Sequence, residues 1–364
     1  MFSPRKLRLV KKLIPHLIMW VMGGTLYVLL EHGLLGESTS YPSTGNPYDF
    51  GQSFVSVLVL GIVAGSTFGL FEELLFKDLL SRRPFGLKVV VKTVFYEAFL
   101  IIILIVFTAF INSVSLDVPL FHHQIADATI KFVSNFAFAS VVIYSSVLIG
   151  LSLFISEIID HIGLNAITNF FTGRYSKSKV EDRVFMFLDM KSSTTIAEKL
   201  GHEQYYQLLN NYYSDMTNAV IDTAAEIYQY VGDEIVVSWE YAPGVENNNC
   251  LRCFFLIKDQ IEKRSSFYQQ KFGVVPGFKA GLHHGKVTAG EVGLIKKEIL
   301  FTGDVLNTSA RIQGLCNELG VDLLISADLA NVLNIEGAFD AEAKGSFELR
   351  GRDQRIELFA VERA

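Results

Sequence analysis

Residues 226–239 read EIYQYVGDEIVVSW, two runs of β-branched and aromatic residues on either side of Gly232-Asp233. Residues such as Val, Ile, Tyr and Trp are enriched in strands, and a Gly-Asp step between two such runs is a strong hairpin signal. The stretch predicts two antiparallel strands, 226–231 and 234–239, with Asp233 in the turn between them.

A second acidic residue ends the preceding apolar run. Residues 184–188 read VFMFL, which is typical of a strand buried on both faces, and the run stops at Asp189. Ser and Thr at 192–195 favour the start of a helix, and residues 205–223 predict an amphipathic helix. Because adjacent strands lie about 5 Å apart, we expect Asp189 and Asp233 to approach each other.

Two converging carboxylates with no basic neighbour repel each other, so they are stable mainly with a cation between them. Oxygen ligands that leave coordination positions open suit Mg²⁺ held jointly with substrate phosphates. Such ions promote phosphoryl transfer. On these residues alone, the hypothesis is metal-dependent phosphoryl transfer. The alternative is a pair of ordinary structural turn aspartates.

The downstream segment adds further candidate residues. Residues 278–290, FKAGLHHGKVTAG, predict a strand, a break at glycine and a second short strand, and we interpret His283 and His284 as structural. Residues 303–311, GDVLNTSAR, begin a helix. Asn307 and Arg311 are four positions apart and so project from one helix face. An amide and a guanidinium on one face can bind a ribose oxygen and a transferring phosphate.

The N-terminal half has the composition of a membrane domain. Hydrophobic residues make up 50% of the 364-residue chain, and most of the excess precedes residue 160. A helix needs about 20 apolar residues to cross a bilayer, and four stretches come close to that length or exceed it: 13–30, 54–76, 89–111 and 132–159. The first stretch resembles a signal peptide, but it has no small-residue cleavage site, and we expect it to be retained.

Basic residues predict the orientation of these four spans. The segments 31–53 and 112–130 contain no Lys or Arg. Basic residues cluster instead at the N-terminus, in the loop with Lys77, Arg82, Arg83 and Lys88, and after the fourth span at Arg174, Lys177 and Lys179. By the positive-inside rule, the sequence predicts a multi-pass protein of the cell inner (plasma) membrane with both termini in the cytoplasm.

Several ionisable residues accompany the spans. Glu72, Glu73 and Glu157 lie near span ends, where solvation at the interface is the preferred interpretation. Glu97 lies deeper, and for it both a ligand or signalling role and a simple structural role stay open. His122 and His123 are interpreted as a solvated pair on an outer loop, with metal binding or pH sensing as the alternative.

Charge and cysteine content exclude other classes. A net charge of −6 gives no reason to expect nucleic-acid binding. Three cysteines in the polar half suit a reducing compartment. Cys250 and Cys253 form a C-x-x-C, but no second Cys/His pair stands at zinc spacing, so we interpret them as ordinary thiols on a helix face.

The motifs together resemble the class III adenylate/guanylate cyclase family, of the membrane-anchored bacterial type. The resemblance covers residues 183–363 and rests on four segments in order: FLDMKSS (187–193), VGDE (231–234), LHHG (282–285) and GDVLNTSAR (303–311). It implies an α+β catalytic domain, an α/β sandwich with a ferredoxin-like palm, following an all-α transmembrane bundle of four helices. The predicted domains are 1–159 (membrane), 160–182 (a linker or coupling helix) and 183–364 (catalytic).

The resemblance also assigns roles to residues. Asp189, Asp233 and the backbone carbonyl of Met190 match the metal ligands, which bind two Mg²⁺ or Mn²⁺ ions. Asn307 matches the residue that orients the ribose, and Arg311 the arginine that stabilises the transition state. Arg350 falls where the family often supplies a further phosphate-binding residue. Because the family builds its site from two subunits, the resemblance implies a homodimer with two equivalent sites.

The positions that read the base depart from the family. The family usually has Lys four positions before the second metal aspartate and Asp or Thr seven before the asparagine. Here these positions hold Gln229 and Leu300. Gln can donate and accept hydrogen bonds, whereas Leu cannot do either. ATP is favoured over GTP because the guanylate-type Glu and Cys are also missing.

The sequence therefore predicts a membrane-anchored adenylate cyclase that converts ATP to 3',5'-cyclic AMP and diphosphate for intracellular signalling. One alternative is a guanylate cyclase. A second is a diguanylate-forming enzyme, since Gly232-Asp233-Glu234 resembles its core, but that family has another Gly before the Asp and lacks the Asn-to-Arg segment. A third is a catalytically silent membrane receptor or scaffold, against which the retention of both aspartates, Asn307 and Arg311 argues.

Overall fold

The computed structural model describes residues 4–41, 47–76, 83–348 and 355–364. It divides into two compact units, Leu7–Thr168 and a unit that contains Asn169–Ala364. Lys77, Arg82 and Arg350, which the sequence singled out, lie outside the described residues. The predicted boundaries at 159/160 and 182/183 remain predictions.

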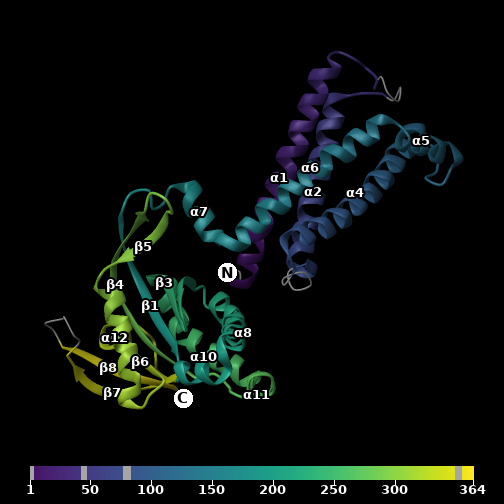
Figure 1. Ribbon diagram of the computed structural model, residues 1–364. Coiled ribbons are helices and arrows are strands. Elements are labelled where there is room, and N and C mark those ends of the chain that lie inside the picture. The colour runs from purple at the N-terminus through teal and green to yellow at the C-terminus, as the bar shows by residue number, and fades with distance from the viewer. Residues whose placement is uncertain (1–3, 42–46, 77–82, 349–354) are drawn as a thin grey trace. The chain divides into compact units, whose positions relative to one another are not determined.

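The first unit is helical (Figure 1). Among the described residues, four helices are long and apolar enough to cross a membrane: Leu13–Leu35, Phe50–Phe76, Phe85–Val114 and Phe136–Ile159. The four predicted apolar helices are thus present. The complete elements are α1 (Pro4–Leu35), α2 (Phe50–Phe71) with the π-helical turn η1 (Glu72–Phe76), α4 (Phe85–Leu116), α5 (His123–Val133) and α6 (Phe136–Ile162).

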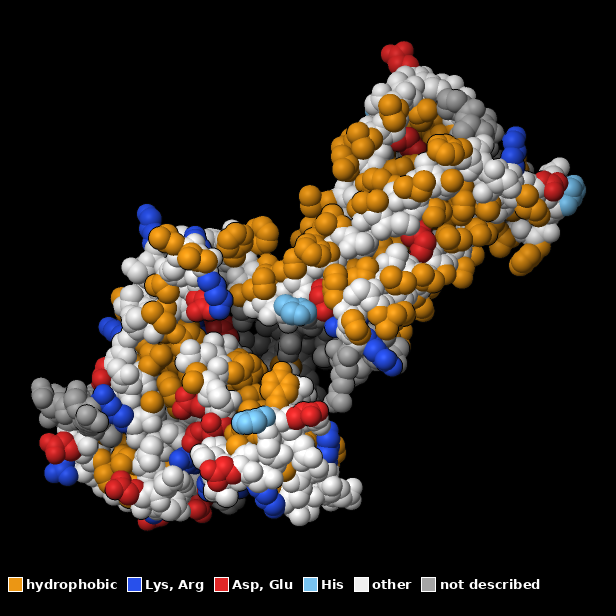
Figure 2. Space-filling view, viewed as in Figure 1, with side chains coloured by type: hydrophobic (Ala, Val, Ile, Leu, Met, Phe, Trp, Pro, Cys, Tyr) orange, Lys and Arg blue, Asp and Glu red, His pale blue; other side chains and the backbone are white. Residues whose placement is uncertain are grey.

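Apolar side chains cover the outside of these helices. Figure 2 shows hydrophobic side chains over much of the visible surface of the helical unit. A soluble protein rarely exposes an apolar patch of that extent, whereas lipid favours it. On the inside, α2 lies close to α1, because a Cβ added at Gly65 would come within 2.9 Å of the Cα of Leu17.

The interior of the helical unit holds polar groups. Lys92 donates a 2.5 Å hydrogen bond to Glu72, and the hydroxyl of Tyr96 donates one of 2.6 Å to the same carboxylate. The interpretation of Glu72 as an interfacially solvated residue is therefore wrong, because its charge is paired inside the bundle with the side chain only 11% exposed. Glu97 accepts hydrogen bonds from Ser145 and Ser146 on α6.

Two further groups lie towards the ends of the membrane helices. Glu157 pairs with Lys88 at 3.1 Å. At the opposite end, His122 caps α5 through Nδ1, which accepts from the backbone of Gln124, and its ring lies 4.3 Å from that of His123. The short helix α5 was not predicted.

The joint between the units is not a continuous helix. The helix of the fourth span, α6, continues past Asp160 to Ile162, and Gly163, with a φ of +92°, separates it from α7 (Leu164–Thr172). A second glycine in the left-handed region, Gly173 at +62°, follows the end of α7. This conformation strains any residue with a Cβ, so both positions favour glycine.

The second unit is built on a mixed sheet (Figure 1). Eight strands among the described residues form it, in the order β2-β3-β1-β4-β6-β8-β7 with β5 paired to β4. Their bounds are β1 Lys179–Met190, β2 Glu226–Val231, β3 Glu234–Glu240, β4 Phe278–Val292, β5 Glu298–Thr302, β6 Leu323–Ser326, β7 Phe339–Phe347 and β8 Ile356–Arg363. The predicted hairpin 226–239 is present as β2 and β3.

Helices cover the two faces of the sheet. Alternate residues of a strand point to opposite faces, so Val184, Met186 and Leu188 of β1 contact one core and Phe185 and Phe187 another. The first core is closed by helices α8 (Ser193–Asp222) and α10 (Asn249–Lys263), and the opposite face of the sheet by α12 (Asp304–Leu319). Shorter elements complete the unit: α9 Tyr241–Val245, η2 Glu246–Asn248, α11 Ser265–Phe272 and α13 Ala327–Ala330.

Two local predictions need correction. The helix predicted over 205–223 begins at Ser193 and is interrupted at Gly201, which has a φ of +74°. The predicted glycine break in 278–290 is absent, since β4 runs unbroken to Val292. Its glycines make room for α12 instead: a Cβ at Gly281 would lie 2.2 Å from the backbone nitrogen of Gln313, and one at Gly285 would lie 2.9 Å from a Val305 methyl.

Candidate active site

The candidate site begins where β1 and the β2–β3 hairpin end. Asp189 is the penultimate residue of β1 and pairs across to Glu234, the first residue of β3. Asp233 precedes Glu234 in the hairpin turn, beside Gly232 with a φ of +63°. Burial raises the pKa of Asp189 above its usual range, and the neighbouring Asp233 carboxyl raises it further. The structure thus brings the two predicted residues into contact.

The hairpin turn is held in place by a tyrosine from α8. The hydroxyl of Tyr213 donates a 2.8 Å hydrogen bond to the carbonyl of Gly232. Its ring lies 4.6 Å from that of Tyr230 on β2. Because Gly232 immediately precedes Asp233, this contact fixes the position of the aspartate relative to the helical layer.

Two residues that sequence reasoning missed lie against Asp189. Lys279 of β4 stands directly opposite Asp189 in the sheet, with its amino group 3.5 Å from Oδ2. Gln313 of α12 donates to the same oxygen at 3.3 Å. The expectation of an aspartate pair without a basic neighbour is therefore wrong. The available signal was a single Lys in the otherwise apolar start of β4.

Asn307 and Arg311 lie on the outer side of α12. Asn307 is exposed and Arg311 half-buried. Within the described part of the chain, neither side chain contacts Asp189 or Asp233. Helical geometry explains this, because Ser309 and Gln313 face the sheet and leave the other two residues on a different face.

The remaining predicted positions are scattered around these strands. Met190 is the last residue of β1 and is buried. Gln229 is exposed on β2 opposite Val236, and Leu300 is exposed on β5 opposite Gly290. Nearby, His283 contacts Ser326 at 2.7 Å, and His284 contacts the carbonyl of Asp328 at 3.0 Å. These contacts agree with the structural interpretation of the two histidines.

The electrostatics of the site suit a bound cation. Burial and the two neighbouring aspartates also raise the pKa of Glu234, so negative charge is in excess here despite Lys279. No group of three or more His, Cys, Asp or Glu side chains with metal-binding geometry occurs among the described residues. Two carboxylates such as Asp189 and Asp233 would hold Mg²⁺ jointly with substrate phosphates, as is common for this ion.

The sheet, the paired aspartates and the exposed Asn/Arg face describe a nucleotide-processing class of domain, and comparison identifies its family. The profile of the adenylate and guanylate cyclase catalytic domain matches residues 176–363, just over half of the chain. The chain belongs to this family.

Curated relatives extend the similarity. The chain is 35% identical over 222 residues to adenylate cyclase 2 of Rhizobium meliloti (strain 1021), covering 61% of each protein. It is 25% identical over 183 residues to an adenylate cyclase of Anabaena cylindrica, covering 48% of this chain and 36% of that protein. The chain therefore spans less than two thirds of the length of these relatives.

A solved structure supports the fold. A bacterial light-regulated adenylyl cyclase superposes with a TM-score of 0.52 at 20% sequence identity, covering 60% of this chain and 63% of that one. At this identity the likeness concerns the fold alone.

Proposed function

We propose that this protein is a membrane-anchored adenylate cyclase that converts ATP to 3',5'-cyclic AMP and diphosphate. The observation that carries the proposal is the contact between Asp189 and Asp233 at the end of β1 and the β2–β3 turn, in a chain of the cyclase family. The 35% identical relative is an adenylate cyclase, which supports ATP as the substrate.

The site is shared between two copies of the chain. Asn307 and Arg311 make no contact with the aspartates of their own chain among the described residues. A second copy related by a two-fold axis would set them opposite its aspartates, and the symmetry would generate two equivalent sites. The homodimer is therefore part of the proposal.

Asp189 and Asp233, with the backbone carbonyl of Met190, would hold two Mg²⁺ or Mn²⁺ ions. When bound, these ions neutralise the polyphosphate and favour ionisation of the attacking hydroxyl. Lys279 balances part of the aspartate charge. Asn307 binds the ribose and orients its 3'-hydroxyl towards the α-phosphate, and Arg311 stabilises the charge that develops on that phosphate.

The base pocket is unusual in this proposal. Gln229 and Leu300 take the positions that normally read the purine, and Leu300 has no hydrogen-bonding group. Gln229 alone can donate to or accept from the adenine edge. We therefore expect ATP to be preferred over GTP by less than in a cyclase that has both polar residues.

The membrane half anchors the enzyme in the plasma membrane. The basic residues of the predicted cytoplasmic loops, including Arg83 and Lys88, favour an orientation with both termini and the catalytic domain in the cytoplasm. ATP is available in that compartment.

Incubation of the purified full-length protein with Mg²⁺ or Mn²⁺ and either ATP or GTP, followed by separation of the products, tests the proposal. Cyclic AMP is the expected product. Cyclic GMP as the main product would reassign the substrate, and linear or cyclic diguanylate would refute the cyclase reaction. No product with either nucleotide, in detergent and in membranes, would favour a catalytically silent receptor.

A further inference from the structure

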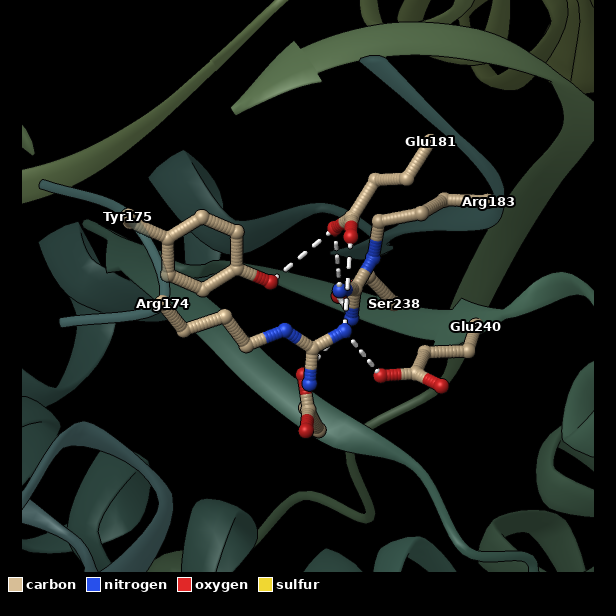
Figure 3. Close-up of polar contacts among 7 residues, drawn as sticks. Arg174, Tyr175, Glu181, Arg183, Ser238 and Glu240 are labelled. Atoms are coloured by element: carbon tan, nitrogen blue, oxygen red, sulfur yellow. Dashed lines mark hydrogen bonds and ion pairs between the residues drawn. The ribbon is translucent and has the colours of Figure 1, made fainter. Parts of the chain in front are cut away.

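The segment that follows α7 is fastened to the catalytic sheet by its side chains. We call residues 173–176 the joint anchor. Arg174 donates a 2.6 Å hydrogen bond to Glu240 at the end of β3 and lies 3.4 Å from Glu181 on β1. The Tyr175 hydroxyl donates to Glu181 at 3.0 Å. The backbone carbonyl of Tyr175 accepts a hydrogen bond from the backbone N–H of Glu291 on β4. Figure 3 shows both side chains directed at Glu181.

The same carboxylate connects the anchor to a buried arginine. Arg183 is 1% exposed and donates to Glu181 at 3.0 Å, to Glu226 at 2.6 Å and to Ser238 at 3.1 Å (Figure 3). Three strands, β1, β2 and β3, are therefore tied to one guanidinium. A displacement of the anchor is transmitted to these strands because a buried charge cannot lose its partners cheaply.

Phe301 of β5 connects the joint anchor to the positions proposed to read the base, because it packs near Tyr175 and is adjacent in sequence to Leu300. Its ring lies 6.3 Å from that of Tyr175 and 4.6 Å from the Arg183 guanidinium. It also lies 5.2 Å from the ring of Tyr228. Phe301 directly follows Leu300, and Tyr228 directly precedes Gln229, so one aromatic cluster supports both base-reading positions.

The cluster reaches α12 as well. Val305 belongs to the same buried core as Tyr175 and Phe301 and stands two residues before Asn307. Asp189, by contrast, lies six positions along β1 from Arg183, about 20 Å away at the rise of a strand. The anchor is thus coupled more directly to the base and ribose positions than to the metal aspartates.

We propose that Arg174 and Tyr175 are positioning residues that act through Phe301 to set the affinity of the site for its nucleotide. The proposal rests on the proposed cyclase function. The joint anchor then sets KM for the nucleotide rather than kcat. A signal from the membrane half that acts through the anchor would therefore change KM. Arg174 and Glu240 are 35% and 46% exposed, and a pair so exposed contributes little to global stability. A variant that lacks the Arg174–Glu240 pair should therefore still fold, so that a change in KM can be distinguished from misfolding.

The test compares steady-state kinetics of full-length variants with ATP. Arg174→Gln should raise KM about threefold or more while kcat stays near the wild-type value, and Arg174→Lys should recover most of the loss. The matched control is Arg363→Gln, since Arg363 of β8 also makes a solvent-exposed pair, with Asp259 of α10 at 2.9 Å, in which the side chains are 50% and 49% exposed. It should leave KM unchanged.

A double-mutant cycle with Phe301→Leu tests the path. If the anchor acts through Phe301, Arg174→Gln should have little further effect on KM in the Phe301→Leu protein. An unchanged KM in Arg174→Gln, a loss confined to kcat, or fully additive effects in the double variant would each overturn the proposal. A wild-type protein with no cyclase activity would instead refute the proposed function, and this inference with it.

Discussion

Lys279, on the strand next to Asp189, supplies a positive charge beside the aspartate pair. Its side chain is 10% exposed, and its amino group lies 3.5 Å from Asp189. Two carboxylates in contact would otherwise repel each other in a partly buried site. The lysine therefore offsets part of this repulsion in the metal-free protein.

Replacing Lys279 by Met should destabilise the metal-free catalytic unit by about 1–3 kcal/mol, since it leaves the partly buried carboxylate of Asp189 without its positively charged partner. Mg²⁺ should restore part of the loss, because the ion supplies the missing positive charge. Denaturant unfolding followed by Trp239 fluorescence in a Trp20→Phe background measures this, as the chain contains two tryptophans. Trp239 is fully buried in the catalytic unit.

Lys279→Arg is the matched control and should keep most of the stability in EDTA. An equal loss for Lys279→Met with and without Mg²⁺ would contradict the counter-charge role and indicate lost packing instead.

Glu181 predicts a pH dependence of stability. Burial works against its charge, but hydrogen bonds from Arg183 and Tyr175 outweigh burial and lower its pKa below the ordinary 4.5. A carboxyl with a depressed folded-state pKa stabilises the fold above its unfolded pKa and loses that contribution as the pH falls through the folded value. Glu181→Gln should therefore be less stable than wild type at neutral pH, with the difference shrinking below about pH 4.5. A difference that does not vary with pH would contradict this account.

At the residue scale, the site residues that the sequence predicted correctly are those marked by a pattern in their immediate neighbours. Asp189 and Asp233 follow from an apolar run that ends in Asp and from a Gly-Asp turn. Lys279 and Gln313 could not be found in this way. Their contacts with Asp189 depend on the pairing of β1 with β4 and on the position of α12 against the sheet. Both contacts are between residues about a hundred positions apart in the sequence. The exposure of Asn307 likewise depends on which face of α12 meets the sheet.

At the element scale, the position of α12 depends on a glycine in β4. The helix lies so close to the strand that a Cβ at Gly281 would come within 2.2 Å of the Gln313 nitrogen and 2.6 Å of the Ser309 oxygen. Both are backbone atoms, so the helix itself would have to move. Asn307 and Arg311 would move with it.

Gly281→Ala should destabilise the catalytic unit by about 1–3 kcal/mol through overpacking and reduce cyclase activity about 100-fold, because small displacements of catalytic groups are costly. Gly314→Ala, on α12 itself, is the control, since nothing lies within 4 Å of the Cβ that it adds. It should be neutral, or stabilise by up to about 1 kcal/mol through helix propensity. Full activity in Gly281→Ala would show that α12 does not need its observed position.

The elements themselves were predictable to different degrees. The hairpin 226–239 and the four apolar helices follow from composition and turn residues that act locally. Helix α5 was missed because the predicted fourth span began at residue 132 and did not include the break at Ser134 and Asn135 that separates α5 from α6. The end of α6 at Gly163 was missed, since a glycine within an apolar stretch is ambiguous between a tolerated residue and an end. The continuous strand β4 was misjudged for a related reason. Its glycines accommodate a neighbouring helix, which the local sequence does not reveal.

At the scale of the whole molecule, the two units have surfaces suited to different solvents, one to lipid and the other to water. The helical unit exposes apolar side chains and pairs Glu72 with Lys92 inside, whereas the catalytic unit buries its apolar residues around a mixed sheet. The composition shift near residue 160 predicted this division, although the compact units separate at Thr168. The dimer was implied by family resemblance, and the outward-facing Asn307 and Arg311 support it independently.

The most direct test of a site shared between two copies is complementation between inactive variants. Asp233→Ala and Arg311→Ala should each abolish cyclic AMP formation when expressed alone, while inserting into membranes and dimerising normally. Co-expressed, they should form heterodimers with one intact site, so that about half of the mixed dimers' sites function. Activity well above either variant alone is the predicted result. Continued inactivity in verified heterodimers, or appreciable activity of Asp233→Ala alone, would contradict the account.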